Sequence, residues 1–115
     1  MKHFALIFRA TRPFTPEENK TRPADIAAWV KHVTEMGIHL DPRNFAETDA
    51  NFSKQGNEIV SHEGPIDPTL STIVYFDAAG KEQAVEIARI HPGLNYGVTV
   101  EVREWSTPRA TPPNP

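Results

Sequence analysis

The stretch that decides the fold is residues 85–105, VEIARIHPGLNYGVTVEVREW. It begins inside a helix, and His91-Pro92-Gly93 ends that helix because the residue before a proline avoids helical backbone angles. A strand follows over residues 98–105. Its side chains alternate between two faces, with Val98, Val100 and Val102 on one and Thr99, Glu101 and Arg103 on the other. This period of two predicts a strand with one packed face and one polar or partly wet face.

Two further runs predict strands that are apolar on both faces. Residues 3–9 (HFALIFR) form the first, with Phe4, Leu6 and Phe8 on one face and Ala5 and Ile7 on the other. Residues 69–77 (TLSTIVYFD) form the second and are rich in β-branched and aromatic residues. The apolar end of this second run, residues 73–76, is typical of a central strand.

Two helices are predicted between these strands. Thr15 and Glu18 form a capping box, but Pro23 would break a hydrogen bond deep inside a helix. We therefore expect a short turn at residues 16–20 and the main helix over residues 23–36. Its apolar stripe at i, i+3, i+4 and i+7 consists of Ile26, Trp29, Val30 and Val33. The second helix spans residues 81–90 and buries Ala84, Val85, Ile87 and Ala88.

The middle of the chain carries a weaker signal. Residues 41–44 are expected to form a turn, and Phe45 is expected to insert into the core. Residues 50–54 and 57–61 flank Gln55-Gly56 and predict a hairpin. The residues expected on its inner side are Phe52, Ile59 and Val60.

Composition limits the class of protein. The 115 residues make one domain, residues 1–105, followed by a proline-rich tail, residues 106–115, expected to be disordered or extended. The net charge of −3 and the absence of a long basic run argue against nucleic acid as a partner. No run approaches the roughly 20 apolar residues of a membrane helix, and none matches a signal peptide, so a cytoplasmic location is expected. Without cysteine there is no disulfide and no thiolate metal site.

The order of the predicted elements is strand, helix, hairpin or strand pair, helix, strand. This is the βαββαβ order of the ferredoxin-like α+β architecture, an antiparallel sheet with two helices on one face. Two of the strands are apolar on both faces, whereas the helices cover only one. A large exposed apolar patch is unusual on a monomer, so we predict a homodimer whose sheets meet face to face in an α+β barrel.

Several motifs resemble one known family. They are Glu63-Gly64-Pro65-Ile66, the strand–helix–strand of residues 69–77, 82–89 and 97–103, and the helix stop Gly37 followed by His39-Leu40. Together they resemble the YCII-related domain in the branch named for its Asp-Gly-Pro-Phe motif, and the resemblance covers residues 3–105. It implies a dimeric ferredoxin-like fold with a pocket between sheet and helices in each subunit.

The resemblance also implies chemistry. Some YCII-like proteins are cofactor-free enzymes that use a His–Asp pair, and dehydrochlorinase chemistry occurs in the wider family. In that group a His follows Arg-Pro-Ala at the first helix. Here Arg22-Pro23-Ala24 is followed by Asp25 instead.

A general acid or base at neutral pH is most easily a His or a carboxylate with a shifted pKa. His62 adjoins Glu63 at a Gly-Pro turn, and loops of this kind reach the start of the first helix, where Asp25 lies. We expect His62, Asp25 and Glu63 to form a catalytic cluster, with His39 and Trp29 as ligand-binding neighbours. The alternative is that both carboxylates cap loops and the His side chains are solvated.

Other candidates have structural alternatives. Arg9 ends the first strand and is expected either to bind an anionic ligand or to form a salt bridge. His91 is expected to cap the second helix as a partly cationic ring, and it is a poor haem ligand. Tyr75 and Tyr96 either line a pocket or pack in the sheet. No spacing indicates a complete metal site, and no cofactor is expected.

Three functions remain open on the sequence. The first is a cofactor-free enzyme of lyase, isomerase or dehydrochlorinase type that acts on a small organic acid or ring compound. The second is a small-molecule-binding or accessory dimer without catalysis. The third is a purely structural dimer.

Overall fold

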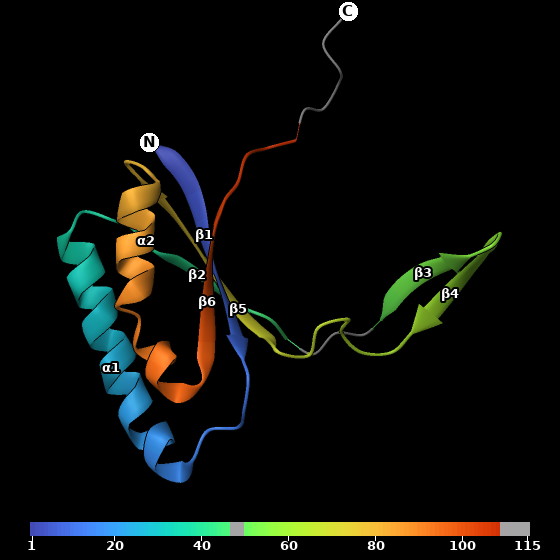
Figure 1. Cartoon of the computed structure of the whole chain (residues 1–115), viewed down its shortest axis with the longest axis horizontal. Helices are drawn as coiled ribbons and strands as arrows, with labels where there is room; N and C mark the ends of the chain where they lie inside the picture. Colours follow the sequence, from blue (N-terminus) through green and yellow to red (C-terminus); the bar gives the residue numbers. More distant parts are fainter. Residues whose placement is uncertain (47–49, 109–115) are drawn as a thin grey trace, which may run out of the picture.

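The two strands that are apolar on both faces lie at the centre of the sheet. A computed structural model describes residues 1–46 and 50–108 of the protein. In it β1 (Lys2–Ala10) pairs antiparallel with β5 (Leu70–Ala78). β6 (Val98–Glu104) pairs with the other side of β1, and β2 (Asp41–Asn44) pairs with the outer side of β5. The antiparallel sheet therefore has the order β2-β5-β1-β6, and Figure 1 labels its four strands.

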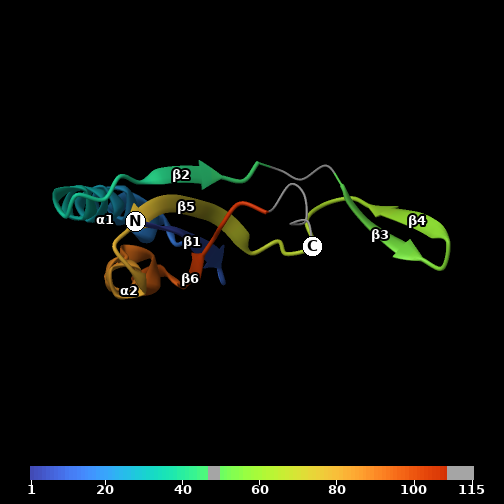
Figure 2. The same cartoon turned by 90° about the horizontal axis from the view of Figure 1, so that it is seen from above.

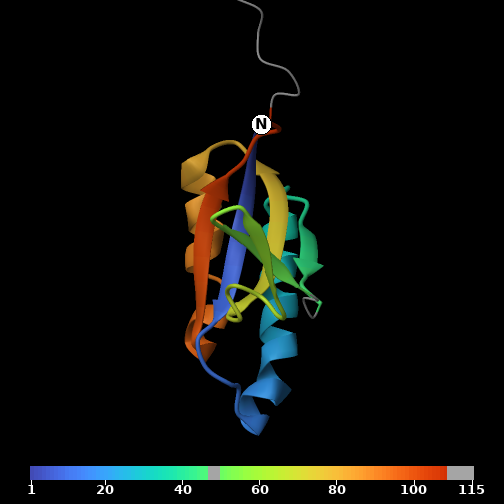
Figure 3. The same cartoon turned by 90° about the vertical axis from the view of Figure 1, so that its right-hand side faces the viewer.

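Both helices lie on the same face of this sheet. They are α1 (Pro16–Glu35) and α2 (Lys81–Arg89), and a short 3₁₀ helix, η1 (Pro92–Tyr96), leads from α2 into β6. Figure 3 shows the strands toward the viewer and both helices behind them. The chain is thus an α+β protein with one helix-covered face. No helix among the described residues is long and apolar enough to cross a membrane.

The core lies between the sheet and the helices. Phe4 and Leu6 of β1, Val33 of α1 and Ile87 of α2 are its largest fully buried side chains. Trp29 joins the two helices, because its Nε1–H donates to the carbonyl of Ile87 at 2.9 Å. The predicted alternation of β6 is confirmed, since its three valines pack on this core from the inner face.

The first helix is longer than expected. The sequence predicted a short turn and a separate helix from residue 23, and this is wrong, because α1 is continuous from Pro16 and contains Pro23. The capping box forms as predicted, with the Glu18 N–H donating to Thr15 Oγ1 and the Thr15 N–H donating to Glu18. Proline leaves the Asn19 carbonyl without its helical donor. Asn19 is exposed, so water can donate to this carbonyl instead.

The expected turn at residues 41–44 is also wrong, because these residues form the edge strand β2. Pro42 is compatible with a strand there, since an edge strand leaves one row of backbone groups unpaired. Phe45, expected in the core, is 52% exposed. Its backbone N–H continues the pairing by donating to the Ser71 carbonyl. The chain therefore keeps following β5 and does not turn inward.

A hairpin of β3 (Asn51–Gln55) and β4 (Glu58–His62) projects away from the main sheet (Figures 1 and 2). The hairpin itself was predicted, and Gly56 has the positive φ of 60° that its turn requires. The expected burial is wrong for Phe52, which is 66% exposed, and for Ile59, which is 68% exposed, whereas Val60 is half-buried. Nothing within residues 1–46 and 50–108 buries these two side chains.

The second face of the sheet carries an apolar centre with charged edges. Ile7 of β1 pairs with Ile73 of β5, and Ala5 pairs with Tyr75. At one edge Arg9 donates to Asp67 at 3.0 Å and to Glu101 at 2.8 Å. No helix covers this face (Figure 3). Of the predicted tail, residues 109–115 lie outside the described residues.

Candidate functional site

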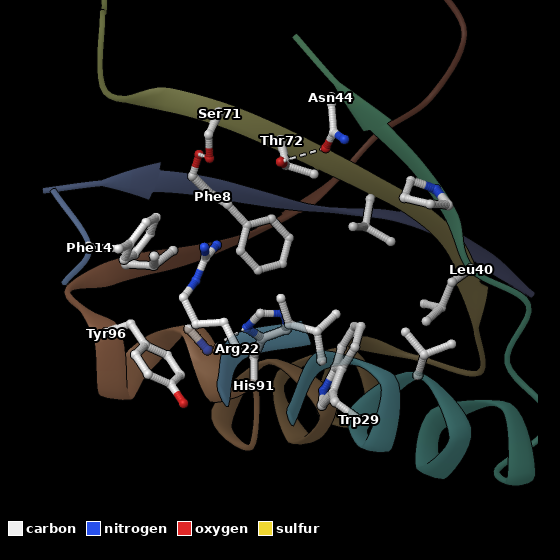
Figure 4. A pocket seen from close by; sticks show the side chains of 16 residues that line it. Phe8, Phe14, Arg22, Trp29, Leu40, Asn44, Ser71, Thr72, His91 and Tyr96 are labelled. Carbon is white, nitrogen blue, oxygen red and sulfur yellow. Dashed lines mark hydrogen bonds between the residues drawn. The ribbon is translucent and has the colours of Figure 1, made fainter. Parts of the chain in front are cut away.

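A cavity of about 590 Å³ lies between α1 and the sheet (Figure 4). The sheet contributes one wall from β1, β2, β5 and β6, α1 contributes the opposite wall, and the segment from His91 through η1 closes one side. Its lining residues include Phe8, Phe14, Arg22, Val30, Asn44, Ser71, Thr72, His91, Gly93 and Tyr96. Trp29, predicted as an apolar wall of a site, also lines this cavity.

The cavity exists because part of the apolar stripe of α1 does not close against the sheet. Trp29 and Val33 are buried, as the periodicity predicts. Ile26 and Val30 instead line the cavity, and Val30 remains 40% exposed. The N-terminal half of the stripe therefore offers apolar surface to a ligand rather than to the core.

His91 lies at the floor of the cavity. Its ring is held between Phe8 and Trp29, each with its ring centre 4.6 Å away. Its Nδ1 accepts the backbone N–H of Gly93 at 2.9 Å. Burial lowers the pKa of His91 to about 4, so the imidazole is neutral at pH 7. The expectation of a partly cationic cap on the second helix is wrong: the ring is neutral and caps η1.

The position of the His91 ring fixes its tautomer. Because Nδ1 is the acceptor, the proton of the neutral ring is on Nε2. Among the described residues, the His91 ring makes no other hydrogen bond, and no fully buried side-chain nitrogen or oxygen lacks a partner. Nε2 is therefore still accessible, and the cavity is the space that His91 lines. The site presents one N–H donor on an otherwise aromatic floor.

Gly93 allows this arrangement. A Cβ at this position would lie 2.9 Å from Nδ1 and 3.2 Å from Cε1 of His91, and 3.2 Å from Cβ of Val98. The His91 ring thus packs directly on the backbone of Gly93, and any residue with a Cβ at this position would collide with it.

Arg22 is the charged group of the cavity. Its guanidinium carbon lies 3.6 Å from the ring centre of Phe14, and Nη1 donates to the Asn19 side chain at 3.4 Å. Arg22 makes no ion pair within residues 1–46 and 50–108. No Asp or Glu is among the lining residues. With His91 neutral, the lining residues give the cavity a positive end, and the carboxylate of Asp25 lies at its edge and accepts from Tyr96.

The hydroxyl groups of the lining are committed within the protein. Ser71 donates to the carbonyl of Phe8 at 3.2 Å, and Thr72 donates to Oδ1 of Asn44 at 2.9 Å. Tyr96 donates to Asp25, and this hydrogen bond raises the pKa of Tyr96. The side-chain N–H groups that remain for a ligand belong to Arg22, His91 and the Asn44 amide.

The predicted catalytic residues do not meet within one chain. Asp25 lies on α1, bonded to Tyr96 at the cavity edge. His62 ends β4 and Glu63 follows it, both exposed, and Figures 1 and 2 show this hairpin standing away from α1. His39 is exposed in the connection from α1 to β2. A meeting of these residues across a dimer stays a prediction.

Arg9 takes the structural role that the sequence left open. It bonds to Asp67 and Glu101 on the face of the sheet away from the cavity, and its hydrogen bond lowers the pKa of Glu101. The salt bridge joins Arg9 to a loop and a strand, because β1 pairs with β6 beside it. The charge of Arg9 is therefore paired with two carboxylates, and Arg9 is not among the residues that line the cavity.

The sequence did not single out Arg22 and His91 as site residues. Arg22 was named only as part of the Arg-Pro-Ala motif, and His91 only as a cap of the second helix and a poor haem ligand. The available signal was the position of His91 directly before Pro-Gly, where a ring can fold back on a glycine. Among the described residues, no group of three or more His, Cys, Asp or Glu could hold a metal ion.

Comparison with protein-family models and with curated proteins finds no match to this chain.

Proposed function

We propose that this protein binds a small organic molecule in the cavity between α1 and the sheet. The observation that carries the proposal is the composition of the cavity wall: aromatic and aliphatic side chains with three polar groups whose N–H donors are uncommitted, Arg22, His91 and Asn44. Cavities of a few hundred Å³ with mostly apolar walls and a few directed polar groups are typical ligand sites. At about 590 Å³ the cavity has room for a molecule of one or two rings.

Binding without catalysis fits this site better than acid–base catalysis. A general base must accept a proton, yet Nδ1 of His91 already accepts the Gly93 N–H and Nε2 carries the ring proton. No carboxylate lines the cavity. We therefore favour the binding or accessory module over the lyase, isomerase or dehydrochlorinase hypothesis. The enzyme hypothesis depends on His62, Asp25 and Glu63 meeting across a dimer.

Blocking the cavity tests the proposal. Val30→Trp places an indole in the cavity, because Val30 lines it. Lys31→Trp is the control, because it places the same indole on the exposed face of α1. Thermal shift with indole, phenol, benzoate and naphthoate should raise the Tm of the wild type and of K31W but not of V30W. Equal shifts in all three proteins would show that these probes bind elsewhere.

We also propose that the fold is ferredoxin-like and that the chain is YCII-related. Two helices on one face of a sheet ordered β2-β5-β1-β6 support the βαββαβ pattern, with the β3–β4 hairpin as an insertion before β5. The motifs of the sequence support the YCII resemblance. A cytoplasmic location belongs to the same proposal.

We further propose a homodimer that covers the second face of the sheet. Ile7, Ile73 and Tyr75 give that face an apolar centre that no helix covers. Burial of such a patch against a second copy removes it from water. Sedimentation equilibrium at micromolar concentration should give twice the 12.9 kDa of the chain, and Ile73→Lys should reduce it to the monomer. A monomer mass for the wild type would exclude this dimer.

A further inference from the structure

The charge of the cavity narrows the class of ligand, given that the cavity binds a small molecule as proposed above. Arg22 lies in a mostly apolar wall with no carboxylate among the lining residues. A guanidinium that loses water on ligand binding is stabilised only if the ligand supplies an acceptor, and a carboxylate matches its planar fork. The Arg22 end of the cavity therefore favours an anion.

Arg22 is held ready for such a contact. Phe14 stacks on the guanidinium at 3.6 Å and Asn19 accepts one of its N–H groups. These two contacts fix the plane of the fork while leaving its other N–H groups unpaired within the described residues. A side chain held in this way loses less rotamer entropy when it binds an anion.

His91 supplies the second point of recognition. Its accessible Nε2–H donates, and the ring lies between Phe8 and Trp29. A flat apolar ligand body packs against these aromatic rings, and an oxygen on that body accepts from Nε2. The third donor, the Asn44 amide, lies on the β2 side, where Thr72 holds its oxygen.

We propose that the cavity takes a small ring carboxylic acid with a second acceptor oxygen. The carboxylate pairs with Arg22 at the α1 end, the ring lies on Phe8 and Trp29, and the second oxygen accepts the N–H of His91. Arg22 and His91 both line this cavity, Arg22 from α1 and His91 from the segment that leads into η1 (Figure 4).

Calorimetric titration of the full chain tests the assignment with matched probes. The acids are benzoate and 4-hydroxybenzoate, and their neutral analogues are benzamide and 4-hydroxybenzamide. A hydrogen bond to a charged group increases affinity about tenfold or more. Each acid should therefore bind at least about tenfold more tightly than its amide. 4-Hydroxybenzoate should bind tighter than benzoate, because only it reaches His91 with an oxygen.

Substitutions of Arg22 and Arg89 distinguish an effect of the charge in the cavity from an effect of the net charge of the protein. Arg22→Gln should weaken binding of both acids by about tenfold or more, and Arg22→Lys should restore part of it, since lysine keeps the charge without the fork. Arg89→Gln makes the same charge change on the exposed face of α2 and should leave binding unchanged. Nitrogen-15 NMR should show the Nε2–H signal of His91 shifting with 4-hydroxybenzoate more than with benzoate.

The outcomes distinguish this inference from the proposed function. Equal affinity for acids and amides, equal effects of R22Q and R89Q, or no binding of either acid at millimolar concentration would overturn the ring-acid assignment. In each case the cavity remains a binding site if V30W abolishes binding of a neutral probe. Acid binding that V30W leaves unchanged would overturn both.

Discussion

Acid should unfold this protein through His91. In the unfolded chain an imidazole binds a proton as the pH falls through about 6.5. In the folded chain burial lowers the pKa of His91 to about 4, so its ring stays neutral well below that pH. Protonation therefore favours the unfolded state. The free energy of unfolding is highest above pH 6.5 and falls as the pH drops toward 4.

The magnitude follows from the two pKa values. One pKa unit corresponds to about 1.4 kcal/mol, so His91 alone should lower the free energy of unfolding by about 2 kcal/mol between pH 7 and pH 5. The carboxylates contribute little in this window. Arg12 and Thr15 lower the pKa of Glu18 to about 2, so the stability linked to Glu18 is present above about pH 4.5 and is lost below it.

Urea unfolding at pH 7, 6 and 5, followed by tryptophan fluorescence, measures this effect. His91→Asn removes the titrating ring while its side-chain oxygen can still accept the Gly93 N–H. The variant should be less stable at pH 7 but should lose about 2 kcal/mol less than the wild type on going to pH 5. His32→Asn changes an exposed histidine on α1 and should follow the wild type.

Parallel pH dependence of the wild type and H91N would refute the reasoning. It would mean that the His91 ring can take up a proton in the folded state as easily as in the unfolded chain. The cavity would then have to hydrate an imidazolium, and its floor would be polar rather than apolar.

Three substitutions test the packing around the site. Gly93→Ala puts a Cβ 2.9 Å from the ring of His91 and should destabilise the fold by about 1–3 kcal/mol in urea unfolding, since the ring must shift. Trp29→Phe removes the donor to the Ile87 carbonyl and should cost about 1–3 kcal/mol in the same assay, since that carbonyl is buried. Thr15→Ala removes the side-chain cap of α1 and should lower the free energy of unfolding by about 1 kcal/mol.

Each substitution has a counterpart elsewhere in the chain. Gly80→Ser adds a Cβ that meets nothing within 4 Å and should stay within about 0.5 kcal/mol of the wild type. Trp105→Phe removes a donor to the Phe4 carbonyl from a partly exposed indole and should cost less than W29F. Thr107→Ala changes an exposed residue after β6. An original substitution no more harmful than its counterpart would contradict the corresponding contact.

The sequence predicts the elements of this fold where a pattern repeats. The alternation in residues 98–105 and in residues 3–9 identifies two strands of the main sheet, and the stripe of Trp29 and Val33 identifies a helix face. The prediction from sequence is wrong where a single proline was taken to end or exclude a regular element. Pro23 does not end α1, because the freed carbonyl is exposed to water, and residues 41–44 form a strand because β5 offers them an edge.

The site was harder to predict because it depends on long-range packing. His91 looks like a helix end in the sequence, and only the approach of Phe8 and Trp29 makes it a buried neutral ring. Arg22 is one of several arginines, and only the cavity distinguishes it. Trp29 was expected beside the cluster of His62, Asp25 and Glu63, and it instead lines the cavity beside His91.

The projecting β3–β4 hairpin separates two kinds of evolutionary change in this protein. The hairpin forms its own backbone hydrogen bonds and lies apart from the cavity. It can therefore change in length or in side chains while β1, β5 and α1 keep their geometry. Selection can therefore change the exposed residues of the hairpin without changing the residues that bind a ligand in the cavity.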